Sequence, residues 1–194
     1  MKLDLGCGGS PHDGYLAVDN NPLCNPAFLH DLNVFPYPFE DNSVDEILMN
    51  GVLEHLDDVM LVVQEMYRIT KPMGIWKITV PHYTKSMQNP THKRGFVKQW
   101  WNLVNANHPR KSEKYLELDI DVVKEKYIWM DNASGIFSVM NRVFSTILNY
   151  NSLFTDRFLS FWLGGIDNIY FEVVVIKGSP YDKGIAFKKR LMRR

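Results

Sequence analysis

The sequence contains few cysteines and no long apolar run. Cys7 and Cys24 are the only cysteines in 194 residues, and neither belongs to a CxxC pair, which excludes a disulfide framework. No stretch approaches the ~18 apolar residues that a membrane span requires. The first residues also lack the basic region and apolar core of a signal peptide. We therefore expect a cytoplasmic protein with reduced thiols and no membrane span.

The chain also lacks a net charge, because 22 acidic residues balance 22 basic ones. No overall field therefore favours nucleic acid or a membrane surface as a partner. The charge is uneven only in the strongly basic segment 188–194. This segment is either a solvated tail or a binding site for an anionic partner such as phosphate, nucleic acid or an acidic lipid surface.

What the chain does contain is typical of a globular protein: 45% of its residues are hydrophobic and 23% are charged. Its length suits one domain with a sizeable core. Near its start, the apolar segment 3–5 runs into a turn that contains Gly6 and Gly8, and a second apolar piece ends at Asp19. Glycines let the backbone approach a ligand, and an acidic residue at this position can accept hydrogen bonds from a ribose. This pattern predicts a nucleoside-binding domain.

The first half alternates strands with crossovers, which favours a parallel α/β sheet. Only residues 6–14 separate the first two expected strands, and a parallel crossover usually needs a dozen or more. We therefore expect the first crossover helix to be shortened or absent. A helix over 52–70 carries an apolar stripe, is capped by Asp57 or Asp58, and is stopped by Pro72 with Gly74. The expected strands are 1–5, 15–19, 27–30, 44–49 and 75–80.

The second half has a different pattern. A polar loop over 82–95 precedes the remaining elements. The aromatic-rich region 127–171 is either core or a lid over an acceptor. We expect helices over 96–107, 136–150 and 153–163, and strands over 115–120, 126–130 and 168–177.

Five segments together resemble class I S-adenosylmethionine-dependent methyltransferases, over residues 1 to about 95. The first is Leu3-Asp4-Leu5-Gly6-Cys7-Gly8, and the last is Arg68-Ile69-Thr70-Lys71-Pro72-Met73-Gly74, in which Met73 replaces the family's first glycine. Between them lie Asp31-Leu32-Asn33, the segment 39–45 and Val52-Leu53-Glu54-His55-Leu56. The resemblance implies a Rossmann-like, mostly parallel sheet with an antiparallel last strand. It also implies one domain with a cofactor-binding half (1–95), an acceptor or lid half with the last strands (96–178), and a basic tail (179–194).

The resemblance also implies S-adenosylmethionine as the cofactor and a role for each matching residue. Asp19 would accept both ribose hydroxyls, Asp31 would bind the adenine amino group, and Leu32 would pack on the ring. Asp4 would order the turn or bind the cofactor's ammonium group, and Asp31 could instead simply cap a turn. The expected cofactor-binding residues are Asp4, Gly6, Cys7, Gly8, Asp19, Asn20, Asp31, Leu32, Asn50 and His55.

The expected acceptor is a small molecule or a glycan, methylated on oxygen or nitrogen. Nucleic acid is disfavoured because Asn50-Gly51-Val52-Leu53 stands where an Asp/Asn-Pro-Pro-Tyr motif would be. The candidate general bases follow the fifth strand: His82, Tyr83 and His92. Each of these could instead be a structural loop residue. No group of residues shows metal-ligand spacing, so no metal site is expected.

Two other functions stay open. A degenerate methyltransferase-like module would bind a cofactor or join a complex without turnover, and the missing first helix favours this hypothesis. A nicotinamide-dependent oxidoreductase receives no support from the residues after the fourth strand. Because a helix that would cover the cofactor is missing, a second copy or a partner chain could close the pocket.

Overall fold

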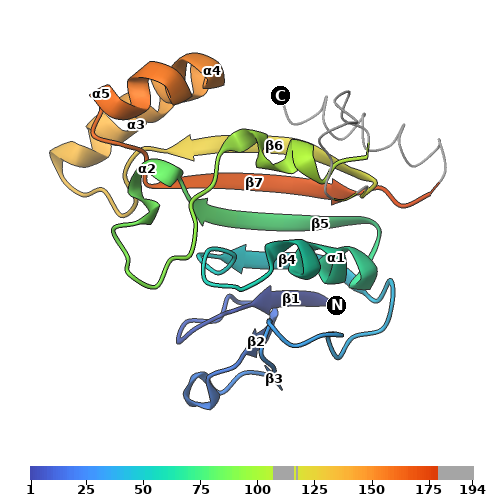
Figure 1. Cartoon of the computed structure of the whole chain (residues 1–194). Coiled ribbons are helices and arrows are strands. Elements are labelled where there is room, and N and C mark those ends of the chain that lie inside the picture. Colours follow the sequence, from blue (N-terminus) through green and yellow to red (C-terminus); the bar gives the residue numbers. More distant parts are fainter. Residues whose placement is uncertain (107–115, 117, 179–194) are drawn as a thin grey trace.

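A computed structural model describes residues 1–106, 116 and 118–178, and within them the core is a mixed β-sheet (Figure 1). The seven strands lie in the order β3-β2-β1-β4-β5-β7-β6. The first five strands pair in parallel, and β7 runs antiparallel to both β5 and β6. This confirms the expected sheet with its antiparallel last strand. The strands are β1 (Lys2–Leu5), β2 (Leu16–Asp19), β3 (Phe28–Leu29), β4 (Val44–Asn50), β5 (Thr70–Pro81), β6 (Ile120–Ile128) and β7 (Asn168–Val175).

The first crossover helix is absent, as predicted. All of residues 6–15 are described, and none of them is helical. Two carboxylates hold this loop instead. Asp4 accepts hydrogen bonds from the backbone N–H of His12 (3.0 Å) and bonds its Nδ1 (2.9 Å), while Asp19 accepts one from the backbone N–H of Gly8 (2.9 Å). The next crossover contains only the 3₁₀ turn η1 (Pro22–Cys24).

The helix predicted over 52–70 is shorter than expected. α1 spans Val59–Ile69, and Asp58 caps it by accepting hydrogen bonds from the N–H groups of Met60 and Leu61. Residues 52–57 form turns rather than helix. The capped helix packs its apolar stripe against the sheet, burying Val59, Val62, Val63, Met66 and Ile69.

Strand β5 begins at Thr70, directly after the helix, rather than at residue 75. Val44 pairs with Thr70 and Glu46 pairs with Ile75, so the intervening residues of β5 bulge out of the ladder. Met73 lies in this bulge with a φ of 65°. Glycine adopts this left-handed conformation at the least cost. This explains why the methyltransferases that the chain resembles have a glycine where this chain has Met73.

Several expectations for the second half need correction. The helix expected over 96–107 is a 3₁₀ segment, η2 (Lys98–Leu103), and the loop 82–95 contains the short helix α2 (Tyr83–Ser86). A single strand, β6, replaces the strands expected over 115–120 and 126–130, because it pairs continuously with β7 apart from one bulge. Residues 115 and 117 lie outside the described part. The expected helices are present as α3 (Ile136–Tyr150), α4 (Ser152–Phe154), η4 (Thr155–Leu159) and α5 (Ser160–Trp162).

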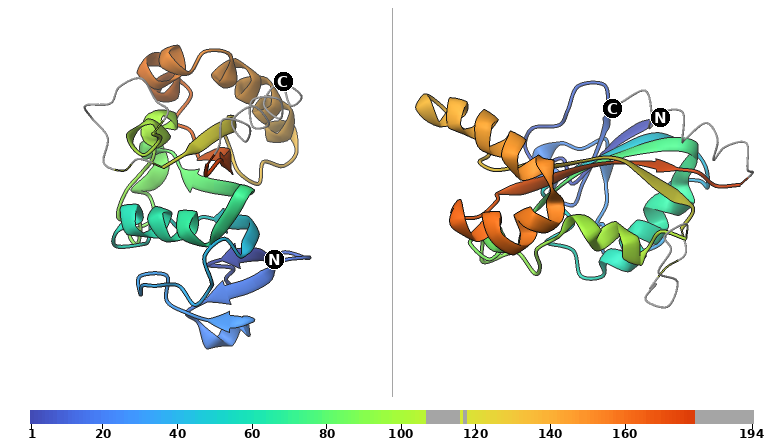
Figure 2. Two further views of the ribbon diagram at one scale, coloured as in Figure 1. Left: turned by 90° about the vertical axis from the view of Figure 1, so that its right-hand side faces the viewer. Right: turned by 90° about the horizontal axis from the view of Figure 1, so that it is seen from above.

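One face of the sheet carries the core, because α1 and η2 both cover it (Figure 2). Trp76 of β5 is fully buried there and packs against Trp101 of η2, whose ring also contacts Phe171 of β7. The opposite face is polar at its centre. There Glu46 accepts a hydrogen bond from the Tyr15 hydroxyl and pairs with Lys77 and Lys2.

This polar cluster predicts a pH-dependent stability. Burial raises the pKa of Glu46, but hydrogen bonds from Lys77, Tyr15 and Lys2 outweigh it and hold the pKa at about 2. A depressed pKa in the folded state stabilises the fold above the unfolded pKa of about 4.3, and this contribution is lost as the pH falls toward 2. We expect Glu46→Gln to lower the free energy of unfolding at neutral pH by roughly 1–2 kcal/mol, after allowance for solvent screening.

Urea unfolding between about pH 3 and pH 7 measures this effect. The difference between the wild type and the variant should shrink as the pH falls. The exposed Glu40 supplies the matched control, and Glu40→Gln should follow the wild-type profile. A pH-independent difference for Glu46→Gln would contradict the assignment.

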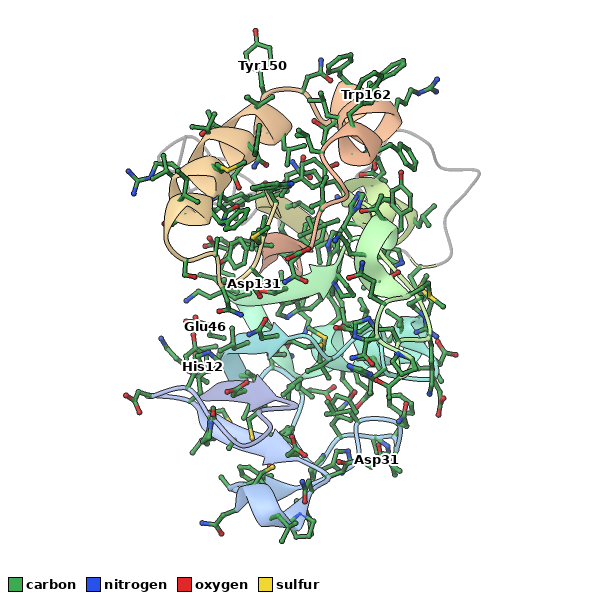
Figure 3. The ribbon with its side chains drawn as sticks, turned by 90° about the vertical axis from the view of Figure 1, so that its left-hand side faces the viewer. His12, Asp31, Glu46, Asp131, Tyr150 and Trp162 are labelled. Carbon is green, nitrogen blue, oxygen red and sulfur yellow. The ribbon has the colours of Figure 1, made fainter. Side chains whose placement is uncertain are left out.

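Helix α3 turns its polar side to the protein and its apolar side outward. The Asn149 side chain bonds both the N–H and the C=O of Tyr127, and Asn141 does the same for Met130. These amides satisfy backbone groups along edge strand β6 and its continuation. In Figure 3 Tyr150 and Trp162 project from the end of the molecule opposite Asp31. The exposed apolar residues of α3–α5 are Ile136, Phe137, Val139, Val143, Ile147, Tyr150, Leu153, Phe154, Phe158, Phe161 and Trp162.

The aromatic-rich region therefore divides between two environments. Tyr127 and Phe171 are core residues, whereas Phe161 and Trp162 are exposed. Within the described residues, no helix combines the length and the apolar character needed to cross a membrane.

Candidate functional site

A pocket of about 290 Å³ lies beyond the carboxyl ends of β1, β2 and β4. The strand order reverses at this point, because β2 and β4 flank β1 on opposite sides. Open α/β sheets bind their ligands at such a reversal. The pocket is lined by Gly6, Asp19, Asn20, His30, Asp31, Leu32, Asn33, Gly51, Val52, His55 and Leu56.

The glycine turn forms one wall of the pocket. Gly6 leaves β1 with a φ of 72°, and its N–H donates to the carbonyl of Val18 (2.8 Å). A Cβ at Gly6 would lie 2.6 Å from Cγ2 of Val52, so only glycine fits between the turn and this pocket residue. The turn therefore brings its backbone directly to the pocket.

Asp19 holds the turn and faces the pocket. Its Oδ2 accepts a hydrogen bond from Gly8 N–H, and its Oδ1 accepts one from Asn21 N–H, both at 2.9 Å. Each carboxylate oxygen keeps a second acceptor site. The sequence offered no structural reason for an acid at this position. The structure supplies one, because Asp19 replaces the missing helix as an anchor of the loop.

The other end of the pocket is shaped by Asp31 and its neighbours. Oδ1 of Asp31 accepts hydrogen bonds from the backbone N–H (2.9 Å) and the side-chain amide (3.2 Å) of Asn33. Asn33 in turn accepts a hydrogen bond from Asp57 N–H (2.8 Å), which ties this loop to the start of α1. Leu32 is buried, with 6% of its surface exposed. A carboxylate beside an apolar wall thus faces one end of the pocket.

Six of the ten predicted cofactor-binding residues line the pocket: Gly6, Asp19, Asn20, Asp31, Leu32 and His55. Asp4 is 2% exposed and serves the loop through His12. Cys7, Gly8 and Asn50 do not line the pocket; burial and the neighbouring Asp19 raise the pKa of the Cys7 thiol. Sequence reasoning missed five lining residues, although each lies within two positions of a predicted one: His30, Asn33, Gly51, Val52 and Leu56.

The three candidate bases fall into two separate groups. His92 lies near the pocket, with its Nε2 3.8 Å from Oε1 of Glu54, and its ring packs edge-on against that of His55. Burial raises the pKa of Glu54, which is 2% exposed. Glu54, His55 and His92 can each offer a ligand atom, and these atoms lie within 4.8 Å of one another. Sequence spacing gave no sign of this group, because His92 comes from a different loop than Glu54 and His55. The expectation that no metal is bound stays a prediction.

His82 and Tyr83 belong to a second group, around Asp156. His82 is fully buried, its Nδ1 lies 2.8 Å from the Thr84 hydroxyl, and its Nε2 lies 3.5 Å from Asp156. The Tyr83 hydroxyl donates to the Asp156 carbonyl (3.2 Å). Burial raises the pKa of Asp156, but the hydrogen bonds it accepts outweigh this and lower it. A buried ring cannot touch an acceptor in this arrangement, so the geometry does not favour His82 as a base.

The sheet order, the glycine turn and the pocket at the reversal together define a class I methyltransferase fold. A family model described as a methyltransferase domain matches residues 17–78. The demethylmenaquinone methyltransferase of Geobacillus stearothermophilus is 39% identical over 62 residues, which are 32% of this chain. The chain covers only 26% of that relative's length.

Two solved structures extend the likeness to most of the fold. The YcgJ protein from Bacillus subtilis has a TM-score of 0.56 at 16% identity, over 91% of this chain and 92% of that one. Phosphoethanolamine N-methyltransferase 2 from Haemonchus contortus, in complex with S-adenosyl-L-methionine, has a TM-score of 0.54 at 17% identity, over 91% of this chain and 48% of that one. The resemblance to class I methyltransferases is thus confirmed in the fold and in the sequence of residues 17–78.

Proposed function

We propose that this protein is an S-adenosylmethionine-dependent methyltransferase that acts on oxygen or nitrogen of a small molecule or a glycan. The observation that carries the proposal is a pocket at the sheet reversal with Asp19 over the glycine turn and Asp31 beside Leu32. The similar enzyme from H. contortus binds S-adenosyl-L-methionine, which supports the same cofactor here.

The pocket chemistry suits the nucleoside part of that cofactor. Asp19 is oriented by two backbone N–H groups, and its remaining acceptor sites suit the two neighbouring hydroxyls of a ribose. Asp31 offers an acceptor for the adenine amino group, while Leu32, Val52 and Leu56 supply apolar contacts for the ring. A volume of about 290 Å³ is at the lower end for ligand pockets, ~300–1,000 Å³. The methionine part would then extend past the glycine turn toward Gly8 and Asn50.

Methyl transfer is an in-line displacement, so most of the catalysis lies in positioning. When bound, the cofactor supplies an electrophilic methyl group. The protein must hold the acceptor atom opposite the leaving sulfur and remove a proton where the acceptor carries one. The group Glu54, His55 and His92 beside the pocket could serve this second task, either through His92 as the base or through a bound metal.

Calorimetry with S-adenosylmethionine and with NAD tests the cofactor. We expect heat of binding with the former and none with the latter, and the reverse result would overturn the proposal. A screen of pooled metabolites for release of S-adenosylhomocysteine then tests turnover. Cofactor binding without release for any pool would favour the second candidate, a degenerate binding module, which the missing crossover helix supports.

A covering partner is part of the proposal. Leu29 and Val34 are exposed on either side of Asp31 in the chain, and Leu23 is exposed on η1, which follows the pocket residue Asn20. Exposed apolar side chains around a pocket are typical of surfaces that bind another chain. Sedimentation velocity with and without the cofactor would show whether a second copy closes this side, and a monomer in both states would argue against it.

A further inference from the structure

Three side chains beside the pocket form a group that the proposed methyl transfer does not by itself require. Glu54 and His55 lie in the turns after β4, and His92 lies in the loop between α2 and η2. The ligand atoms that they can offer lie within 4.8 Å of one another. His55 also lines the pocket, so the group borders the site where an acceptor would be methylated.

The Glu54 carboxylate is buried and incompletely paired. Only 2% of Glu54 is exposed, and its Oε2 has no hydrogen-bond partner among the described residues. Its Oε1 lies 3.8 Å from Nε2 of His92, beyond a normal hydrogen bond. A buried carboxylate with an unpaired oxygen is costly unless a proton or a cation neutralises it. The unpaired Oε2 of Glu54 therefore leaves an acceptor site for a positive partner.

Hydrogen bonds at Nδ1 leave Nε2 available on both imidazoles. Nδ1 of His92 lies 2.7 Å from the carbonyl of Ser86, and a carbonyl can only accept, so Nδ1 carries the proton. Nδ1 of His55 lies 3.2 Å from both the carbonyl and the hydroxyl oxygen of Thr91. That hydroxyl donates its own hydrogen to Asn89 (2.8 Å), which leaves it as an acceptor too.

The lone pairs of both rings consequently lie on Nε2. A ring whose second nitrogen donates to a backbone carbonyl is the usual arrangement of metal-binding histidines. On His92, this Nε2 is the atom nearest the Glu54 carboxylate.

We propose that Glu54, His55 and His92 bind a divalent transition metal ion, with Zn²⁺ as the best fit. Two imidazoles favour zinc over magnesium or calcium, and two histidines with one carboxylate are a known set for zinc with an open fourth position. Ligands ~2.0–2.1 Å from a tetrahedral ion lie about 3.3 Å apart, so ligand atoms now up to 4.8 Å apart must move closer by up to about 1.5 Å. His55 is only partly buried and can make that adjustment.

Because His55 lines the pocket, the fourth, open coordination position of the ion would face the pocket. If the proposed methyltransferase function holds, on which this step rests, the ion would bind an oxygen of the acceptor and lower the pKa of its hydroxyl. The acceptor would then carry a hydroxyl or carboxylate next to the methylated atom. His92 would act as a metal ligand and not as a general base.

Calorimetric titration of the chelator-treated full chain with zinc chloride tests the site. We expect one equivalent to bind, and Glu54→Gln and His92→Ala to weaken binding by at least roughly 100-fold, since losing even an outer partner of a metal ligand costs 10–100-fold. Glu40→Gln and His12→Ala remove a glutamate and a histidine outside the group and should bind zinc like the wild type. Thermal unfolding checks that each variant is folded.

Each outcome decides the proposal. No zinc binding by the wild type, or equal binding by the two cluster variants and the wild type, would overturn it. Binding of S-adenosylmethionine is measured on the same samples. Zinc binding lost only in the cluster variants, in a chain that does not bind S-adenosylmethionine, would refute the proposed function and uphold the metal site. A chain that binds S-adenosylmethionine but does not bind zinc would refute only the metal site.

Discussion

Asp19→Asn is expected to weaken binding of S-adenosylmethionine roughly 100-fold. Asparagine keeps the shape of the side chain, but it replaces one carboxylate oxygen with an NH₂ group. That group would face either the N–H of Gly8 or the N–H of Asn21, both of which now donate to Asp19. The variant side chain would also lack the negative charge and one of the acceptors for the ribose. Hydrogen bonds to charged groups contribute ~1.5–3 kcal/mol, and every ~1.4 kcal/mol changes affinity tenfold.

Calorimetry measures the affinity, and Asp4→Asn separates the two roles of Asp19. Asp4 also anchors the 6–15 loop, through His12, but it does not line the pocket. If Asp19 acts only as an anchor, both variants should weaken binding equally. A ribose contact predicts a much larger loss for Asp19→Asn. Unchanged affinity in that variant would show that the ribose assignment is wrong.

The sequence was most informative where the site is local. The turn at Gly6, the acid at Asp19 and the pair Asp31 and Leu32 each stand at the end of a strand or shortly after it. Strand ends of a parallel sheet meet at one edge. The short first crossover could also be foreseen, because residues 6–15 leave no room for a helix. The contacts that take the place of the missing helix could not be foreseen. The contacts from Asp4 to His12 and from Asp19 to Gly8 depend on how the loop folds back.

The rest depends on contacts between distant segments. His92 reaches Glu54 only because its loop returns to the turn after β4, a juxtaposition that no local spacing encodes. Helix α1 ends before Pro72, as the sequence predicted, but the bulge that contains Pro72 is set by the pairing of β5 with β4. On α3, periodicity correctly predicted the helix but not its orientation. Its amides satisfy the edge of β6, and its apolar face is therefore left exposed.

Gly6→Ala is expected to weaken cofactor binding by at least roughly 100-fold while leaving the sheet folded. Two effects add. A φ of 72° costs an alanine ~1–2 kcal/mol, and its Cβ would lie 2.6 Å from Cγ2 and 2.8 Å from Cγ1 of Val52. Val52 lines the pocket and lies under the turn, so relief of the clash must displace either the pocket wall or the turn. Calorimetry reports the affinity, and urea unfolding should show a loss of roughly 1–3 kcal/mol.

Two further variants separate the causes. Gly9→Ala adds the same methyl group three residues later, where a Cβ meets nothing within 4 Å, and should bind the cofactor like the wild type. The double variant Gly6→Ala with Val52→Ala removes the atoms that clash but keeps the strained φ. It should therefore recover part of the affinity, and the remaining deficit measures the cost of the left-handed turn. If Gly6→Ala alone binds S-adenosylmethionine normally, the turn does not approach the cofactor, and the pocket must receive it in another orientation.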